Sequence, residues 1–269
     1  MSMLSSLLQP RVRVEERAND ARQEMQILVI SLEGAEVRRR LMRAQLELPG
    51  MPPYRFVDAV DGRASLSDET GAPRRVRQAL SPLEIACARS HLSAYKSIAD
   101  HQIPVALVFE DDALLGYQFL QVTDRLLPLV DPARPQAILL SHVVRYSAWA
   151  AQRVDKIHRL CRPYEAYGAH AYLITLAGAR SMLAASARVR TPADDWLYFM
   201  KAGILEVSAL VPYLVGTSPL STASQLGNWQ PQLSEGGWRS WLWKYLWQKF
   251  LFQLLAKSVL RLRRDEQTW

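Results

Sequence analysis

The sequence lacks several features that assign many proteins to a class. Among its 269 residues there are two cysteines, Cys87 and Cys161, far apart and without a histidine-rich neighbourhood, so neither a disulfide framework nor a zinc site is indicated. No stretch offers about 18 uncharged apolar residues, which argues against a transmembrane helix. Residues 1–10 lack a basic segment and a long apolar run, so no secretory signal is expected. A reduced, cytoplasmic compartment fits best.

A glycine-rich phosphate-binding motif is also absent, although the N-terminal part alternates in the way of an α/β protein. Residues 25–31 and 54–60 have strand character, and residues 36–48 favour a helix. The apolar face of that helix is expected to carry Val37, Leu41, Ala44 and Leu48. Strand, helix and strand form the opening of a nucleotide-binding layout. Because the glycine-rich motif is absent, any nucleotide bound here is held without a P-loop.

What the sequence does have is a buried strand that ends in acids. Residues 105–109 are an uninterrupted apolar run, as in a strand covered on both faces of a mostly parallel sheet, and Glu110, Asp111 and Asp112 follow at once. Ligands of open α/β sheets bind at the carboxyl ends of the strands. Carboxylate oxygens suit Mg²⁺ or Mn²⁺, which commonly bridge them to phosphates. The alternative is a solvated acidic turn, and the residues alone leave both readings open.

A second well-defined feature is a helix start at Ser81. Ser81 as N-cap, Pro82 in the first turn and Glu84 three residues after the cap form a capping box. Glu84, His91 and Tyr95 are spaced so that they lie near one face of this helix. They are therefore candidates for a site, but the plainer reading is that Glu84 only caps the helix and His91 only packs.

A second acidic pair, Asp194 and Asp195, stands at another expected helix start. Acids at that position stabilise a helix by capping and by complementing its dipole, which needs no catalysis. Catalysis by either residue remains the alternative at this point.

Four blocks of the sequence resemble glycosyltransferase family 25, which includes bacterial lipooligosaccharide galactosyltransferases and the animal collagen galactosyltransferases. The blocks are Val29 to Leu32 with Arg38 and Arg39 after them, Ala59 to Gly62, Glu84 to His91, and Phe109 to Ala113. Weaker similarity continues to the segment that ends at Asp194, so the resemblance covers about residues 25–225. One departure is Ala86, where the family usually has glycine.

This resemblance implies a GT-A-like α/β fold, with a mixed, mostly parallel sheet, that uses a nucleotide-sugar donor. It implies that Asp112, with Asp111, binds Mn²⁺ or Mg²⁺ and so neutralises the diphosphate leaving group. Asp194 matches the family's acid and is the expected catalytic base of an inverting transfer, with Asp195 the other candidate. The donor-binding residues it implies are Ser31, Leu32, Asp61, Glu84, His91, Glu110 and Asp111.

The C-terminal segment carries a separate signal. Residues 238–264 contain four tryptophans and two phenylalanines among many leucines, with a polar stripe that recurs every four residues. Residues 238–269 hold five of the chain's seven net positive charges. A basic, Trp-rich amphipathic helix is typical of a protein that lies on an anionic membrane surface. The alternative is a helix packed on the domain or on a second subunit, and no nucleic-acid-binding module is visible.

Together these observations predict three parts: a charged lead-in over residues 1–24, a glycosyltransferase domain over 25–225, and a membrane-interface tail over 226–269. The expected function is metal-dependent, inverting transfer of a hexose, with galactose the expected sugar, from a UDP-sugar to a lipooligosaccharide, lipopolysaccharide or other cell-surface glycan acceptor. The acceptor is expected to be a lipid-linked oligosaccharide at the inner face of a bacterial cytoplasmic membrane. The alternative function is a membrane-associated binding or scaffolding protein that keeps the fold without catalysis. The three adjacent acids disfavour that alternative, because a protein without catalysis is under no chemical pressure to hold three repelling charges together.

Overall fold

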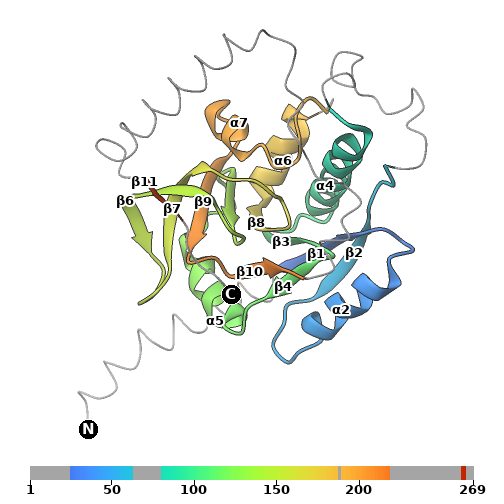
Figure 1. The fold of residues 1–269 in the computed structure, drawn as a ribbon, viewed down its shortest axis with the longest axis horizontal. Coiled ribbons are helices and arrows are strands. Elements are labelled where there is room, and N and C mark those ends of the chain that lie inside the picture. Colours follow the sequence, from blue (N-terminus) through green and yellow to red (C-terminus); the bar gives the residue numbers. More distant parts are fainter. Residues whose placement is uncertain (1–24, 63–79, 187–188, 219–261, 265–269) are drawn as a thin grey trace, which may run out of the picture.

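A computed structural model describes residues 25–62, 80–186, 189–218 and 262–264 (Figure 1). The helices are α2 (Glu36–Leu46), α4 (Pro82–Asp100), α5 (Phe119–Leu126), α6 (Leu176–Ala185) and α7 (Trp196–Lys201), and a 3-10 turn η2 (Leu127–Leu129) follows α5. The strands are β1 (Gln26–Ser31), β2 (Tyr54–Asp58), β3 (Val105–Glu110), β4 (Ala113–Leu115), β5 (Gln136–Leu139), β6 (Arg145–Arg153), β7 (Arg159–Glu165), β8 (Ala171–Thr175), β9 (Glu206–Val211), β10 (Val215–Thr217) and β11 (Leu262–Arg264).

Nine of the strands form one mixed sheet in the order β11-β6-β7-β9-β5-β8-β3-β1-β2, and β10 and β4 form a separate pair. The strands β2, β1 and β3 are parallel to one another, as are β5 and β9. All other neighbours in this sheet are antiparallel. Strand β8 lies between β3 and β5 and runs antiparallel to both, and the β6–β7 hairpin with β11 extends the sheet beyond β9. The expected α/β fold with a mixed sheet is confirmed, but the parallel part is smaller than expected.

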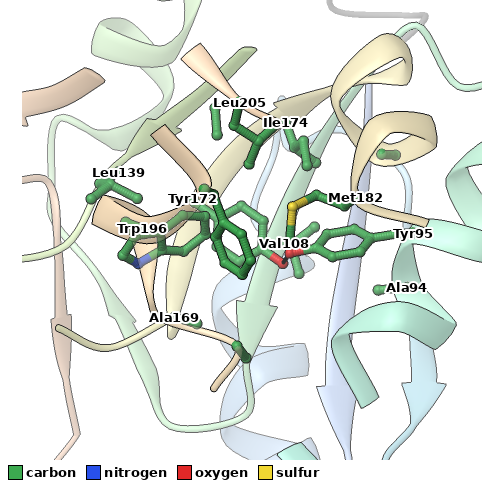
Figure 2. Close-up of a cluster of buried hydrophobic side chains, with 14 of the residues drawn as sticks. Ala94, Tyr95, Val108, Leu139, Ala169, Tyr172, Ile174, Met182, Trp196 and Leu205 are labelled. Atoms are coloured by element: carbon green, nitrogen blue, oxygen red, sulfur yellow. Dashed lines mark hydrogen bonds between the residues drawn. The ribbon is translucent and has the colours of Figure 1, made fainter. Parts of the chain in front are cut away.

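Helices cover both faces of this sheet. On one face α4, α6 and α7 lie over the core that contains Tyr95, Tyr172 and Trp196 (Figures 1 and 2). On the other face α2 and α5 lie over a second core. Strand β3 contributes alternately to both, with Val108 on the first side and Phe109 on the second, which is why its sequence is an unbroken apolar run. The parallel strands thereby bring the ends of β1 and β3 to one edge of the sheet.

The face that α2 buries differs from the expected one. Val37 and Leu48 are each 59% exposed, and the buried residues are Met42 and Leu46. The helix is rotated so that its arginines reach the sheet edge, where Arg38 contacts Asp111. Contacts with the end of the sheet therefore set the orientation of α2. The exposure of Val37 and Leu48 is not unusual, because single apolar side chains are common on protein surfaces.

Two features of the second half of the chain were not predicted from the sequence. The segment around Tyr146 and Trp149 is strand β6, which pairs with β7 in an antiparallel hairpin. Leu262–Arg264 is a strand paired antiparallel with β6, so the expected C-terminal amphipathic helix does not extend to Arg264. Residues 219–261, which contain the rest of that predicted helix, lie outside the described residues. Among the helices described, none has the length and the apolar character that a bilayer span requires.

The turn between β6 and β7 is organised by Asp155. Its Oδ1 accepts hydrogen bonds from the backbone N–H groups of Ile157 and His158, both at 2.7 Å, and its Oδ2 lies 2.9 Å from His158 Nδ1. Arg125 of α5 reaches the same carboxylate at 3.3 Å. Burial opposes ionisation, but the hydrogen bonds and the charge of His158 outweigh it and lower the pKa of Asp155 to about 2.

Asp155→Asn is expected to lower the free energy of unfolding at neutral pH but not at low pH. A carboxylate whose pKa is lower in the folded state stabilises the fold above its unfolded pKa, 3.8, and loses that contribution as pH falls toward 2. Urea unfolding of wild type and variant from neutral pH down to about pH 3 measures the difference, which should shrink below about pH 4. The exposed variant Asp100→Asn is the control, and a difference that is independent of pH would contradict the assignment.

Candidate active site

The site begins where β1 and β3 end side by side, since Ile30 is paired with Glu110. Ser31, the last residue of β1, donates its Oγ–H to Asp111 Oδ2 at 2.7 Å. Arg38 Nη1 donates to Asp111 Oδ1 at 3.0 Å. Both carboxylate oxygens of Asp111 are thus engaged, which fixes this side chain between β1 and α2 and favours a role in positioning over one as an open metal ligand.

A second arginine holds the end of β1 itself. Arg39 Nη2 donates to the carbonyl oxygen of Ser31 at 3.1 Å and to Asp58 Oδ1, in β2, at 2.7 Å. Its guanidinium also lies 5.0 Å from the centroid of the Phe56 ring. Leu32 follows directly, and its carbonyl accepts the Ala35 N–H that turns the chain into α2. Arg38 and Arg39 were noted in the sequence, but their structural roles depend on these contacts across the sheet.

Asp112 differs from Asp111 because its Oδ1 is buried and has no hydrogen-bond partner. Burial, together with the charges of Glu110 and Asp111, raises the pKa of Asp112 to about 6 against the opposing charge of Arg38. Its backbone carbonyl accepts the Ser218 N–H at 2.7 Å, which anchors the loop after β3. An acidic oxygen that is buried without a donor is the feature a cation would complete.

Glu110 and His91 lead from the sheet edge into the core. His91 Nε2 lies 3.3 Å from Glu110 Oε1, and His91 Nδ1 lies 2.7 Å from the Tyr172 hydroxyl. The Tyr172 hydroxyl donates in turn to the Tyr95 hydroxyl at 2.9 Å (Figure 2). Burial opposes ionisation of Glu110, yet the hydrogen bond and charge of His91 outweigh it and lower the pKa of Glu110. His91 is therefore more than a packing residue, because it links a site carboxylate to the core.

The start of α4 is close to the same carboxylates. The predicted capping box is confirmed: Ser81 Oγ accepts the Glu84 N–H at 3.2 Å, and Glu84 Oε2 accepts the Ser81 N–H at 2.7 Å. Burial, followed by the charges of Glu110, Asp194 and Glu84, raises the pKa of the Cys87 thiol. The charges of Glu84, Glu110 and Asp194 therefore act on one thiol, although one oxygen of Glu84 is engaged in capping its own helix.

The loop that carries Asp61 packs on this helix. The N–H of Val60 donates to Ser90 Oγ at 2.9 Å. A Cβ added to Gly62 would lie 3.0 Å from the Ala86 Cβ and 2.8 Å from a Leu83 methyl carbon, so this position requires glycine. The methyl group of Ala86 is therefore accommodated by Gly62 opposite it. Asp61 is held beside α4 by these neighbours.

The two acids before α7 have different roles. Asp195 is the N-cap, and its Oδ1 accepts the Tyr198 N–H at 3.2 Å. Asp194 Oδ2 accepts the N–H of Gly168 at 2.7 Å, and the Trp196 indole N–H donates to the Gly168 carbonyl at 3.0 Å. Gly168 has a φ of +86°, a conformation that side chains disfavour. Capping accounts for Asp195, whereas Asp194, just before α7, is held by Gly168 of the loop before β8 through Oδ2, which leaves its Oδ1 for another role.

In the described part of the chain, one group of three metal-ligating side chains converges: Cys87, His91 and Glu110, whose ligand atoms all lie within 4.8 Å of one another. Asp111 and Asp112 belong to no such group among the described residues. The metal ligands predicted from the sequence were Asp111 and Asp112, and Cys87 was not among them. A cysteine and a histidine four residues apart on a helix were the signal that could have identified it.

The family model of glycosyltransferase family 25, described as an LPS biosynthesis protein, matches residues 24–197. The chain belongs to this family. The matched range includes β1, α4, the acidic end of β3 and Asp194, which are the elements that form the candidate active site. The predicted family is thereby confirmed, and the roles of the individual site residues stay predictions.

Three curated relatives are similar to parts of the chain. The lacto-N-neotetraose biosynthesis glycosyltransferase LgtE of Neisseria meningitidis serogroup B is 38% identical over 95 residues, 34% of this chain and 34% of that protein. Procollagen galactosyltransferase 2 of Homo sapiens is 27% identical over 189 residues, 65% of this chain and 30% of that protein. The "Probable inactive glycosyltransferase 25 family member 3" of Bos taurus is 28% identical over 191 residues, 65% of this chain and 31% of that protein. The matched part spans about a third of the length of each relative.

Proposed function

We propose that this protein is an inverting, metal-dependent glycosyltransferase with a GT-A-like fold. In this proposal it moves a hexose, with galactose the expected sugar, from a UDP-sugar to a lipooligosaccharide, lipopolysaccharide or other cell-surface glycan acceptor. The observation that carries it is the pair of carboxylates at the ends of β1 and β3: Asp111 is held by Ser31 and Arg38, and Asp112 has a buried oxygen that lacks a partner. A site of this kind suits a donor with a charged leaving group.

Asp112 fits the cation that such a donor requires. Its buried oxygen has no protein donor, and hard oxygen ligands are what Mn²⁺ and Mg²⁺ prefer. A divalent ion held there, with Asp111 beside it, would offset the charge of the leaving diphosphate. Ser31, Leu32, Asp61, Glu84, His91, Glu110 and Asp111 are proposed to line the donor site around it.

Asp194 is proposed to be the catalytic base. In an inverting displacement the acceptor hydroxyl attacks the anomeric carbon from the side opposite the diphosphate, while a carboxylate removes the hydroxyl proton. Asp194 keeps one oxygen beyond its bond to Gly168, and Gly168 and Trp196 hold the loop that carries it. Asp195 is occupied as a helix cap, which favours Asp194 of the two candidates.

A screen of the purified protein against UDP-sugars tests the proposal. We expect manganese-stimulated release of UDP or transfer to a glycan acceptor with one UDP-hexose, and the comparison of UDP-galactose with UDP-glucose identifies the sugar. The absence of turnover with every donor, in the presence of Mn²⁺ or Mg²⁺ and a lipooligosaccharide acceptor, would favour the second function below.

The second candidate is a non-catalytic, membrane-associated binding or scaffolding protein with the same fold. The observation that favours it is the bovine relative whose name calls it inactive. Donor binding without turnover in the same screen would support it, because a scaffold can keep the pocket and lose the chemistry.

We also propose that residues 238–261 bring the protein to the cytoplasmic face of the membrane, where a lipid-linked acceptor would be found. The charge-reversing triple variant Lys249→Glu, Lys257→Glu, Arg261→Glu is expected to weaken flotation with anionic liposomes, because each positive charge near such a surface contributes about 1 kcal/mol. This variant leaves β11 intact. Equal flotation of wild type and variant, or none for either, would contradict membrane binding by this segment.

A further inference from the structure

Cys87 and His91 lie one helical turn apart on α4, and both face Glu110 at the end of β3. His91 Nε2 and Glu110 Oε1 are 3.3 Å apart. In a tetrahedral zinc site with bonds of about 2.1 Å, a nitrogen and an oxygen ligand lie about 3.4 Å from each other. The spacing of these two atoms therefore matches a pair of ligands on one metal ion.

The orientation of His91 favours the same conclusion. The Tyr172 hydroxyl donates to Tyr95, so its oxygen is left to accept a proton from His91 Nδ1. Nε2 lies 3.3 Å from Glu110 Oε1, and in the metal-free protein a second proton on a charged imidazole makes the hydrogen bond between them. In a neutral imidazole that donates from Nδ1, the lone pair is on Nε2, and a cation between Nε2 and the Glu110 oxygen would take the place of that proton. Histidines that bind metals commonly donate their second N–H in this way.

The charge around Cys87 also suits a cation. Besides burial, the negative charges of Glu110, Asp194 and Glu84 raise the pKa of its thiol, and the same negative charges attract a cation. A divalent ion bound there would displace the thiol proton to solvent and leave a thiolate bonded to the metal. Access exists through Glu110, whose side chain is 29% exposed whereas that of His91 is 2% exposed.

We infer that Cys87, His91 and Glu110 form a binding site for Zn²⁺. A thiolate and an imidazole select zinc over the hard ions Mg²⁺ and Mn²⁺, which prefer oxygen ligands such as Asp112. Three protein ligands leave a fourth position for water or a bound molecule. The protein would then hold two kinds of cation at neighbouring places, separated by ligand chemistry.

Zinc in this site would oppose sugar transfer, a consequence that rests on the proposed function. Bound zinc engages Glu110, which that function places in the donor site, and adds positive charge beside Asp194. Inhibition by Zn²⁺ is expected to need at least about tenfold more metal in Cys87→Ser than in wild type, because losing even a group that only supports a zinc ligand typically lowers metal affinity by about 10–100-fold.

The direct test uses Co²⁺, which binds zinc sites and absorbs light, and it needs no transferase activity. Full-length protein with one equivalent of Co²⁺ should give a near-ultraviolet charge-transfer band of a cobalt thiolate, and one equivalent of Zn²⁺ should remove it while excess Mg²⁺ does not. Cys87→Ser should abolish the band, and Cys161→Ser, the same change at the second cysteine, should keep it. Glu110→Gln should weaken the binding of Co²⁺ without removing the thiolate band.

Failure of the wild-type protein to show the band would overturn the inference, as would a band that survives in Cys87→Ser. Circular dichroism of Cys87→Ser and Cys161→Ser confirms that each is folded before the comparison. A positive cobalt result in a protein without turnover would reject the proposed function and leave the zinc site standing.

Discussion

Asp194→Asn is expected to reduce the rate of sugar transfer by about 10²–10⁴-fold, the range typical of losing a general base. Asparagine has nearly the shape of aspartate and can still accept the Gly168 N–H through its amide oxygen, so the loop before β8 should keep its position. It cannot take the proton of the acceptor hydroxyl. The loss should therefore fall on kcat and leave the affinity for the UDP-sugar almost unchanged, as for a group that acts in the transition state.

The matched control is Asp195→Asn, one residue away. Asparagine is a good N-cap, so α7 should remain folded and transfer should be close to wild type. Transfer kinetics with saturating acceptor and calorimetric titration of the UDP-sugar separate the two effects. If Asp195→Asn loses the rate and Asp194→Asn keeps it, the base is Asp195 and the carboxylate bound to Gly168 only holds the loop.

Local features of the fold could be predicted from sequence. The helix start at Ser81 requires only residues within one turn of it, and the strand β3 is signalled by its own apolar run. The orientation of α2 could not be predicted in this way, because it depends on Arg38 and Arg39 reaching β1, β2 and Asp111. The β6–β7 hairpin was missed since its burial alternates irregularly and its register shifts within the hairpin.

The candidate site could be predicted only in part. Its acids stand in sequence blocks, so Glu110, Asp111, Asp112 and Asp194 can be named as candidates from the sequence alone, and their roles stay predictions. The contacts that distinguish them join residues far apart in the chain: Ser31 with Asp111, and His91 with Tyr172. No local sequence pattern encodes such pairs. Only the folded structure shows that Asp111 is hydrogen-bonded, that one oxygen of Asp112 is buried without a partner, and that Cys87 lies close to Glu110.

The difference between Asp111 and Asp112 leads to the second large prediction. Asp112→Asn is expected to remove most metal-stimulated transfer, because it deletes the negative charge from the one acid of the cluster that has a buried oxygen without a partner. Folding should not suffer. The amide is nearly the same size, and it takes a charge away from a site where Glu110 and Asp111 already repel it.

Three measurements test this prediction on the same samples. Transfer is followed as Mn²⁺ is titrated, and the variant should need far more metal or show no stimulation. Thermal unfolding of the metal-free proteins should give a Tm for Asp112→Asn that is equal to or above that of wild type. The control Asp100→Asn removes an exposed carboxylate paired with Lys96, and it should change neither quantity, since surface ion pairs contribute little. Full manganese-stimulated turnover in Asp112→Asn would mean that other residues bind the cation. Lost activity with a lowered Tm would mean that Asp112 stabilises the loop after β3 and has no direct part in the reaction.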